Sequence, residues 1–229
     1  MKRFRTLTTA SFFSLIICAA ASAGPTWQYY AGGDAGFNLL SLNGSLERAV
    51  TEGRIGNNAM SGTWEMAIWQ QGGVGTPQTT AQKAWTNGSD VGFTLAYDGV
   101  DTITYTIGGT SISWNNLAGP FTDIFIRTRS ATDSSVSLTD LDLDGFSIGN
   151  LSSSGNGVVN YLRIQNNSAN FGAFALTGTQ NFSWTGAQPS NSALAYQIKL
   201  TNVIPEPATL ALVAAGGLVL LRRRRPGVH

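Results

Sequence analysis

The stretch VGFTLAYDGVDTITYTIGGTSISW, residues 91–114, decides the fold. Its apolar side chains recur at every second position, which is the pattern of half-buried β-strands. Asp98-Gly99 supplies a first turn, and Gly108-Gly109 supplies a two-residue hairpin turn of the kind that needs a positive φ. The stretch therefore predicts three antiparallel strands joined as a meander. The alternating residues are Val91, Phe93, Leu95, Tyr97, Ile103, Tyr105, Ile107, Ile112 and Trp114.

The same alternation predicts strands on both sides of the meander. Further strands are expected at residues 63–69, 124–126, 136–138, 141–143, 158–164, 171–176, 182–184 and 194–200. Residues 45–51 fit either a strand or a helical turn. The apolar parity slips at Thr139-Asp140, which indicates a bulge or a turn because one extra residue moves later side chains to the other face.

Two of these strands also predict which residues share a face. Residues 63–69 place Trp64, Met66 and Ile68 together. In the last strand one face carries Leu194, Tyr196, Ile198 and Leu200, and the other carries Ala195, Gln197 and Lys199.

These observations predict an all-β protein. About ten short strands separated by turns, with no long helical period, are typical of a two-sheet antiparallel β-sandwich. Residues 24–202 are long enough for one domain with a sizeable core. The single cysteine, Cys18, lies before this region, so we expect no disulfide in the body.

The first residues have the pattern of a signal peptide. Lys2, Arg3 and Arg5 precede an apolar run at residues 12–21, and Ala21-Ser22-Ala23 forms an A-x-A cleavage site. We therefore expect residues 1–23 to form a signal helix, to pass through the Sec translocon and to be removed by signal peptidase after Ala23. A buried N-terminal helix is the alternative.

Residues 203–229 form a second special segment. Pro205-Glu206-Pro207 comes first, then fourteen apolar residues at 208–221, then Arg222, Arg223, Arg224 and Arg225. As a helix rising ~1.5 Å per residue, the run spans about 21 Å of a ~30 Å hydrocarbon core, so we expect a transient transmembrane anchor. The arginines should stay cytoplasmic. An ordinary tail anchor and a buried apolar helix are the alternatives.

This order of triplet, apolar run and arginines resembles the PEP-CTERM sorting signal, apart from four extra residues at 226–229. The resemblance implies a protein exported by a Gram-negative bacterium that makes extracellular polysaccharide, and processing by an exosortase, a membrane-embedded transpeptidase-like enzyme. It makes Pro205, Glu206 and Pro207 the recognition triplet. It also implies an inner-membrane intermediate with a periplasmic body, and then delivery to the cell surface or the extracellular matrix.

The body resembles the choice-of-anchor modules, the W type among them, that precede such tails. The residues that carry this resemblance are 93–99, 111–114, 160–164, 174–178 and 182–184. That family implies no particular chemistry.

The charge of the body differs from that of the whole chain. Residues 24–204 carry seven basic and twelve acidic side chains, a formal charge of −5, whereas the whole chain is at +1. The remaining basic residues gather at the two ends. An acidic body argues against nucleic-acid binding.

One acidic motif has the spacing of a calcium loop. Asp140, Asp142 and Asp144 alternate and precede Gly145. The closing glutamate of such a loop would fall at position 151, which is a leucine. A strand with a solvated acidic face explains the motif as well, and we expect no bound metal or other cofactor.

Other features bear on carbohydrate binding and catalysis. Most of the six tryptophans sit at inward parity, but Trp69 and Trp85 do not, and exposed coplanar rings there would support glycan binding.

The only histidine, His229, lies in the tail, which excludes a histidine-based triad from the body. Asp98 with Asp101, and Glu47 with Glu52, are expected to have turn or surface roles.

The sequence thus predicts an exported, non-enzymatic protein of the cell surface or matrix. A carbohydrate-binding module acting on exopolysaccharide is the first alternative. A secreted glycosidase is the second, and it would require a cleft with two facing carboxylates.

Overall fold

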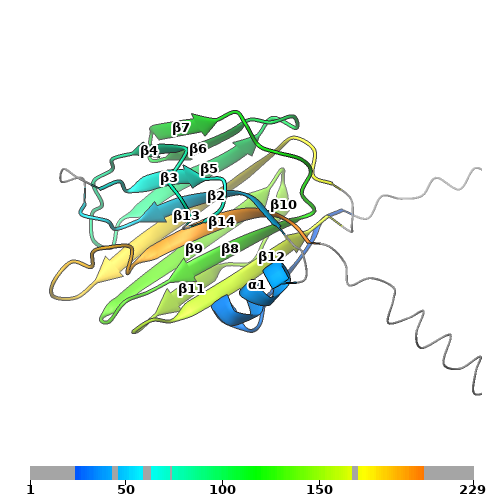
Figure 1. Cartoon of the computed structure of the whole chain (residues 1–229). Coiled ribbons are helices and arrows are strands. Elements are labelled where there is room, and N and C mark those ends of the chain that lie inside the picture. Colours follow the sequence, from blue (N-terminus) through cyan, green and yellow to red (C-terminus); the bar gives the residue numbers. More distant parts are fainter. Residues whose placement is uncertain (1–23, 43–45, 59–62, 73, 167–169, 204–229) are drawn as a thin grey trace, which may run out of the picture.

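The computed structural model describes residues 24–42, 46–58, 63–72, 74–166 and 170–203, which form two antiparallel sheets of seven strands each around a shared core (Figure 1). The first sheet has the order β1 (Thr26–Tyr29), β12 (Val159–Gln165), β8 (Asp123–Arg129), β14 (Ala195–Asn202), β2 (Leu46–Arg54), β3 (Met66–Trp69) and β4 (Thr79–Ala81). The second has the order β10 (Phe146–Ser147), β9 (Ser134–Leu143), β13 (Phe174–Trp184), β5 (Asp90–Tyr97), β6 (Ile103–Ile107) and β7 (Thr110–Trp114), and β11 (Leu151–Ser154) also pairs with β9. The predicted all-β, two-sheet architecture is confirmed, with fourteen strands in the described residues instead of about ten.

The predicted meander is confirmed as β5, β6 and β7. Ile103, Tyr105 and Ile107 are fully buried in the core between the sheets. Gly108 and Gly109 turn the chain with φ values of 50° and 85°, a conformation that costs glycine little because it has no Cβ.

The slip of parity at Thr139-Asp140 is a β-bulge inside β9. Thr139 pairs with Thr179 and Asp142 with Thr177, so Asp140 and Leu141 together face the single residue Gly178. Asp140 has a φ of 53°. A Cβ on Gly178 would lie 2.7 Å from Leu141 Cδ2, so the glycine leaves the space that Leu141 fills in the core.

Several local expectations were wrong. Residues 171–176 and 182–184, expected as two strands, belong largely to the single long strand β13. The helix α1 (Gly33–Leu42) was not predicted; its two glycines favour a turn, and the packing of Phe37 against Phe125 and Tyr161 overrides that preference. Trp64 packs with Trp69, away from Met66 and Ile68, because β3 begins only at Met66.

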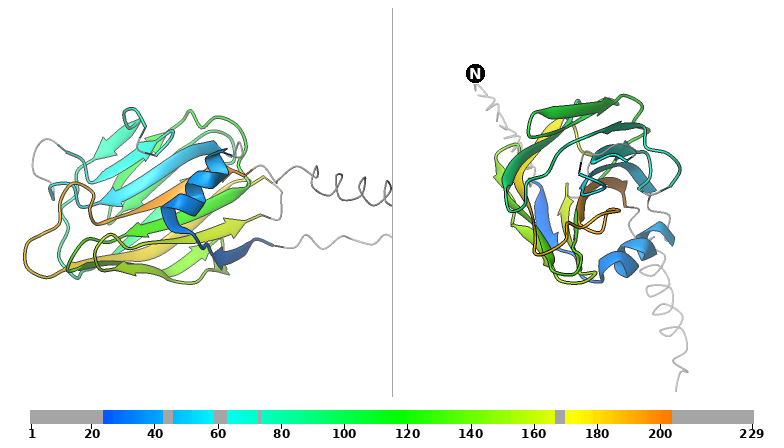
Figure 2. Two further views of the ribbon diagram at one scale, coloured as in Figure 1. Left: turned by 60° about the horizontal axis from the view of Figure 1, so that its bottom comes forward. Right: turned by 90° about the vertical axis from the view of Figure 1, so that its left-hand side faces the viewer.

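The outer face of the first sheet is unusually charged. Six of the seven basic residues of the body lie on its strands: Arg48, Arg54, Arg127, Arg129, Arg163 and Lys199. The helix α1 covers part of this face (Figure 2). Two small apolar clusters, separate from the main core, flank the charged region: one joins Phe37, Phe125 and Tyr161, and the other joins Val50, Ala67 and Trp69.

The two predicted terminal helices lie outside the described residues. Within the part of the chain that the structure describes, no helix has the length and apolar character needed to cross a membrane. The chain enters the sandwich before β1 and leaves it after β14 at the same end (Figure 1).

Candidate functional site

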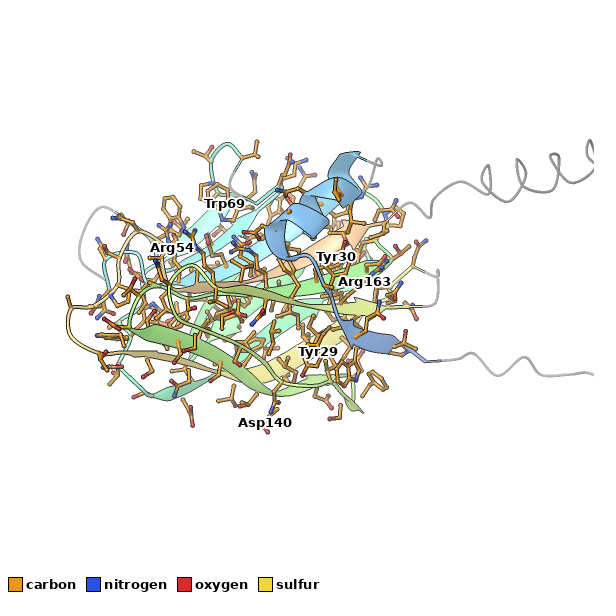
Figure 3. All side chains as sticks on the ribbon, turned by 90° about the horizontal axis from the view of Figure 1, so that it is seen from below. Tyr29, Tyr30, Arg54, Trp69, Asp140 and Arg163 are labelled. Atoms are coloured by element: carbon orange, nitrogen blue, oxygen red, sulfur yellow. The ribbon has the colours of Figure 1, made fainter. Side chains whose placement is uncertain are left out.

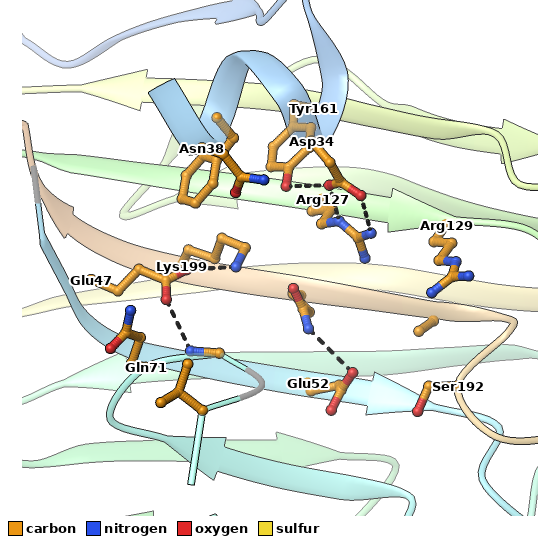
Figure 4. Close-up of a pocket in the computed structure, with 15 residues that line it drawn as sticks. Asp34, Asn38, Glu47, Glu52, Gln71, Arg127, Arg129, Tyr161, Ser192 and Lys199 are labelled. Atoms are coloured by element: carbon orange, nitrogen blue, oxygen red, sulfur yellow. Dashed lines mark hydrogen bonds and ion pairs between the residues drawn. The ribbon is translucent and has the colours of Figure 1, made fainter. Parts of the chain in front are cut away.

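A cavity of about 430 Å³ lies on the outer face of the first sheet. β14 forms its floor, α1 borders one side, and the segment around Gly72 borders the other (Figure 4). Its lining residues are Asp34, Phe37, Asn38, Glu47, Glu52, Gln71, Gly72, Val74, Arg127, Arg129, Tyr161, Ser192, Ala195, Gln197 and Lys199. We call this cavity the outer pocket.

The floor follows from the alternation along β14. Tyr196, Ile198 and Leu200 belong to the main core, as predicted. The intervening Gln197 and Lys199 therefore point outward, and both line the outer pocket.

A bulge in β2 brings Glu47 into the outer pocket. Leu200 pairs with Ala49 and Thr201 pairs with Glu47, so Arg48 is the extra residue. Without it, Glu47 and Glu52 would lie on opposite faces, since they are five positions apart. The expected surface role of Glu47 and Glu52 was therefore wrong, because both line the cavity and Glu52 is only 6% exposed.

Asp34 on α1 is the centre of one polar network. Arg127 donates from Nε to Oδ1 and from Nη2 to Oδ2, both at 2.7 Å, and the Tyr161 hydroxyl donates to Oδ1 at 2.7 Å. The hydrogen bonds from Arg127, helped by that from Tyr161, hold the pKa of the Asp34 carboxyl below its ordinary value. Burial and the hydrogen bond to Asp34 raise the pKa of Tyr161. This network fixes α1 to β8 and β12.

Lys199 and Glu47 form the second ion pair. Lys199 Nζ donates to Glu47 Oε1 at 2.6 Å, and the N–H of Gly72 donates to Glu47 Oε2 at 2.9 Å. Lys199 is 6% exposed and its ammonium lies 4.8 Å from the centroid of the Phe37 ring. The Tyr161 ring stacks on the Phe37 ring with 5.4 Å between their centroids. Tyr161 and Lys199 therefore already lie against the Phe37 ring.

Glu52 and Arg129 are left without an ion-pair partner among the described residues. Glu52 Oε1 accepts one hydrogen bond, from Gln197 Nε2 at 3.2 Å. Figure 4 shows Glu52, Arg129 and Ser192 around the same part of the outer pocket. Ala195, which pairs with both Arg129 and Arg54, contributes only a methyl group there. The arrangement suits binding, because it offers an unpaired charge of each sign beside an open floor.

The three aspartates with calcium-loop spacing are not gathered into a metal site in the described residues. Asp142 Oδ1 accepts the N–H of Gly145 at 2.7 Å, and Asp144 Oδ1 accepts the N–H of Ala175 at 2.9 Å. Asp140 is the bulge residue and projects from the second sheet (Figure 3). In the described ranges, no group of three or more histidine, cysteine or acidic residues is placed to hold a metal ion.

The two tryptophans that sequence parity singled out as candidates for a sugar platform are buried. Trp69 is 7% exposed and Trp85 is 4% exposed. Trp69 meets Trp64 edge to face at 65°, and Trp85 Nε1 donates to the buried Glu65 at 3.0 Å. Neither Trp69 nor Trp85 offers an exposed ring, so these two residues do not support the glycan-binding alternative.

The sequence carried a partial signal for the outer pocket. The outward parity of Gln197 and Lys199 was readable from β14, and Arg127 and Arg129 follow an apolar strand. The position of Asp34 was not readable, since α1 was not expected. The predicted sorting and cleavage residues, namely Ala21, Ala23, Pro205, Glu206, Pro207 and Arg222 to Arg225, lie outside the described residues.

Replacing Asp34 by Asn should destabilise the protein in a pH-dependent way. The variant leaves the mostly buried Arg127 without its carboxylate, so we expect a loss of about 1 to 2 kcal/mol at pH 7. Because the folded-state pKa of Asp34 lies below its unfolded value, this contribution is present above about pH 4 and fades as the pH falls through the folded value. Urea denaturation of both proteins at pH 7, 5 and 3 measures the difference.

Asp133→Asn is the matched control, since Asp133 is an exposed turn residue. It should change the free energy of unfolding by less than about 0.5 kcal/mol. A difference between wild type and Asp34→Asn that stays constant from pH 7 to pH 3 would contradict the ionised Asp34–Arg127 pair.

Comparison with known proteins concerns a short part of the chain. No curated protein matches the chain. Residues 203–225 match the PEP-CTERM protein-sorting motif, which begins directly after β14 ends at Asn202. This motif indicates sorting by an exosortase and export through the membrane to the cell surface. The matched residues leave out the folded body, so its choice-of-anchor resemblance stays a prediction. The chain carries a PEP-CTERM sorting motif at residues 203–225.

Proposed function

We propose that the chain is a non-catalytic protein of the cell surface or extracellular matrix. The observation that carries this proposal is the sorting motif at residues 203–225, placed next to a complete sandwich. The Sec translocon and signal peptidase would handle residues 1–23. The tail would then hold a membrane intermediate with its body in the periplasm until an exosortase processes it.

The position of the motif supports processing after folding. The last described residue, Val203, is still tied to the body, because its N–H donates to Thr122 Oγ1 at 3.3 Å. β14 is already paired on both edges, with β2 and β8. Cleavage beyond residue 203 would therefore remove no strand from either sheet.

The carboxylates of the outer pocket support a non-catalytic body. Glycoside hydrolysis needs two acidic groups free to exchange protons or attack the sugar. Both oxygens of Asp34 and both oxygens of Glu47 already accept hydrogen bonds from the protein. Of the three carboxylates that line the outer pocket, Glu52 is the one with an oxygen that has no protein donor among the described residues.

Changing Pro205, Glu206 and Pro207 together to alanine tests the sorting proposal. The variant should remain full length in the membrane fraction, because the triplet that the processing enzyme recognises is gone. Western blotting of membrane and released fractions from the native host measures this.

A triple alanine variant at Pro226, Gly227 and Val228 is the matched control, since these residues lie outside the matched motif. It should be released like the wild type. Release of the Pro205–Pro207 variant at the wild-type level would refute exosortase-dependent sorting through this triplet.

Carbohydrate binding is the second candidate function, and a tyrosine-lined hollow favours it. This hollow, of about 450 Å³, is lined by Tyr29, Tyr30, Ala31, Asn150, Leu151, Ser152, Asn160 and Tyr161. The Tyr29 ring is 63% exposed, and its hydroxyl donates to the Asn150 carbonyl at 2.9 Å (Figure 3). Trp27 meets it edge to face at 85°, so the ring is held in place before any sugar arrives.

Tyr29→Ala should weaken binding to the polysaccharide of the producing cells severalfold, because it removes the exposed ring that a sugar could stack on. Co-sedimentation of the protein with the purified polysaccharide measures binding. Val100→Ala, at an exposed site in the β5–β6 hairpin, should leave it unchanged. Equal binding by the wild type and Tyr29→Ala, or none by either, counts against this function.

A further inference from the structure

We propose that the outer pocket binds a small zwitterion, with the ligand's ammonium group at Glu52 and its carboxylate at Arg129. The proposal is independent of sorting and of the tyrosine-lined hollow. It rests on the charges that remain in the pocket after the protein's own ion pairs are formed.

The pocket holds three carboxylates and three cations. Its acids are Asp34, Glu47 and Glu52, and its bases are Arg127, Arg129 and Lys199. Two pairs are closed, at 2.7 Å between Arg127 and Asp34 and at 2.6 Å between Lys199 and Glu47. One acid and one base remain, so the pocket as a whole is neutral but presents two unmatched charges.

Glu52 is the stronger indication of a ligand. It is only 6% exposed, and its single hydrogen-bond donor in the described residues is the neutral amide of Gln197. A buried carboxylate without a cation is costly. Its other oxygen, Oε2, has no protein donor among those residues, and Glu52 lines the cavity. A ligand ammonium at this oxygen would supply the missing positive charge.

Arg129 determines the other end of the ligand. It is exposed, lies on β8 beyond Ala195, and forms no ion pair among the described residues. A ligand with an ammonium alone would leave the Arg129 guanidinium unmatched in the pocket lining, which disfavours a simple amine. A carboxylate on the same molecule pairs with Arg129, and a guanidinium binds carboxylates in a two-pronged geometry.

The walls of the pocket disfavour a neutral sugar. The helix α1 contributes the ring of Phe37 to the lining of the pocket. This ring is already covered by Tyr161 and by the Lys199 ammonium. No free ring face remains there for stacking. Recognition in the outer pocket must therefore come from charge and hydrogen bonds, with Ser192 and Asn38 as further polar groups on its walls.

The separation of the ligand's two charges follows from the sheet. Glu52 lies on β2 and Arg129 on β8, the two strands that flank β14. Glu52 pairs with Gln197 and Arg129 pairs with Ala195, so the two residues are offset by two positions along the strands. Their Cα atoms are then roughly 12 Å apart, from strands ~4.8 Å apart and a rise of ~3.3 Å per residue. Side chains from both ends shorten this gap, so a few methylene groups should separate the ligand's charges.

Isothermal titration calorimetry of the intact chain at pH 7 tests the proposal with a series of defined probes. Glycine, 4-aminobutanoate and 6-aminohexanoate vary the distance between the charges. Butanoate and butylamine remove one charge each from the middle member. We expect one zwitterion to bind, and its affinity to fall at least tenfold when either charge is removed.

Glu52→Gln and Arg129→Gln should each weaken that zwitterion at least tenfold. Asp140→Asn and Arg48→Gln are matched controls outside the pocket lining, and they should bind it like the wild type. Asn at position 140 also suits the positive φ of the bulge. Because Arg129 is exposed, its variant tests the proposal even if Glu52→Gln fails to fold, which a thermal melt reveals.

Three results would overturn the proposal. The first is no saturable binding of any of the three zwitterions up to about 10 mM. The second is binding that both Glu52→Gln and Arg129→Gln retain at full strength. The third is stronger binding of glucuronate than of every zwitterion, because Glu52 would then take sugar hydroxyls instead of an ammonium.

Discussion

The structure depends on a single central strand that has two different faces. β14 pairs with β8 on one edge and with β2 on the other, so neither edge is free and its side chains alone decide what covers it. Tyr196, Ile198 and Leu200 are fully buried in the core between the sheets. On the opposite face Gln197 and Lys199 are polar, and Lys199 is nevertheless almost completely enclosed. A buried ammonium requires a carboxylate close by. That requirement explains why the Glu47 carboxylate lies against Lys199 over β14.

Two bulges adjust side-chain directions that a regular strand could not satisfy. In β2 the extra residue Arg48 turns Glu47 toward Lys199. In β9 the extra residue Asp140 keeps Leu141 in the core, where Gly178 provides room for it. Each bulge reverses the parity of the strand once. The first produces an ion pair and a pocket wall, whereas the second preserves apolar packing. The outer pocket is therefore a consequence of strand irregularity as much as of composition.

These features divide what was predictable from what was not. The alternation at residues 91–114 and 194–200 was enough to predict the meander, the buried face of β14 and its polar face, because burial imposes a period of two. The slip at Thr139-Asp140 was readable for the same reason. The pocket was not predictable, since it joins α1, β2, β8 and β14, which are distant in sequence. The helix α1 is rich in glycine and is held by Phe37 and Asp34 contacts that appear only in the folded chain. Trp69 is buried in a cluster with Val50, and Trp85 packs against Phe182, so both depend on contacts between residues distant in sequence.

The sorting motif at residues 203–225 indicates exosortase-dependent sorting of the protein. The last strand ends at Asn202 and the motif begins at residue 203, so the described strands and the motif share no residue. Mass spectrometry of the C-terminal peptide of the protein released by the native host tests this account most directly. The account predicts a new C-terminus beyond β14, without the apolar run or the arginines at 222–225. Released protein that still carries the peptide through Arg225 would contradict it.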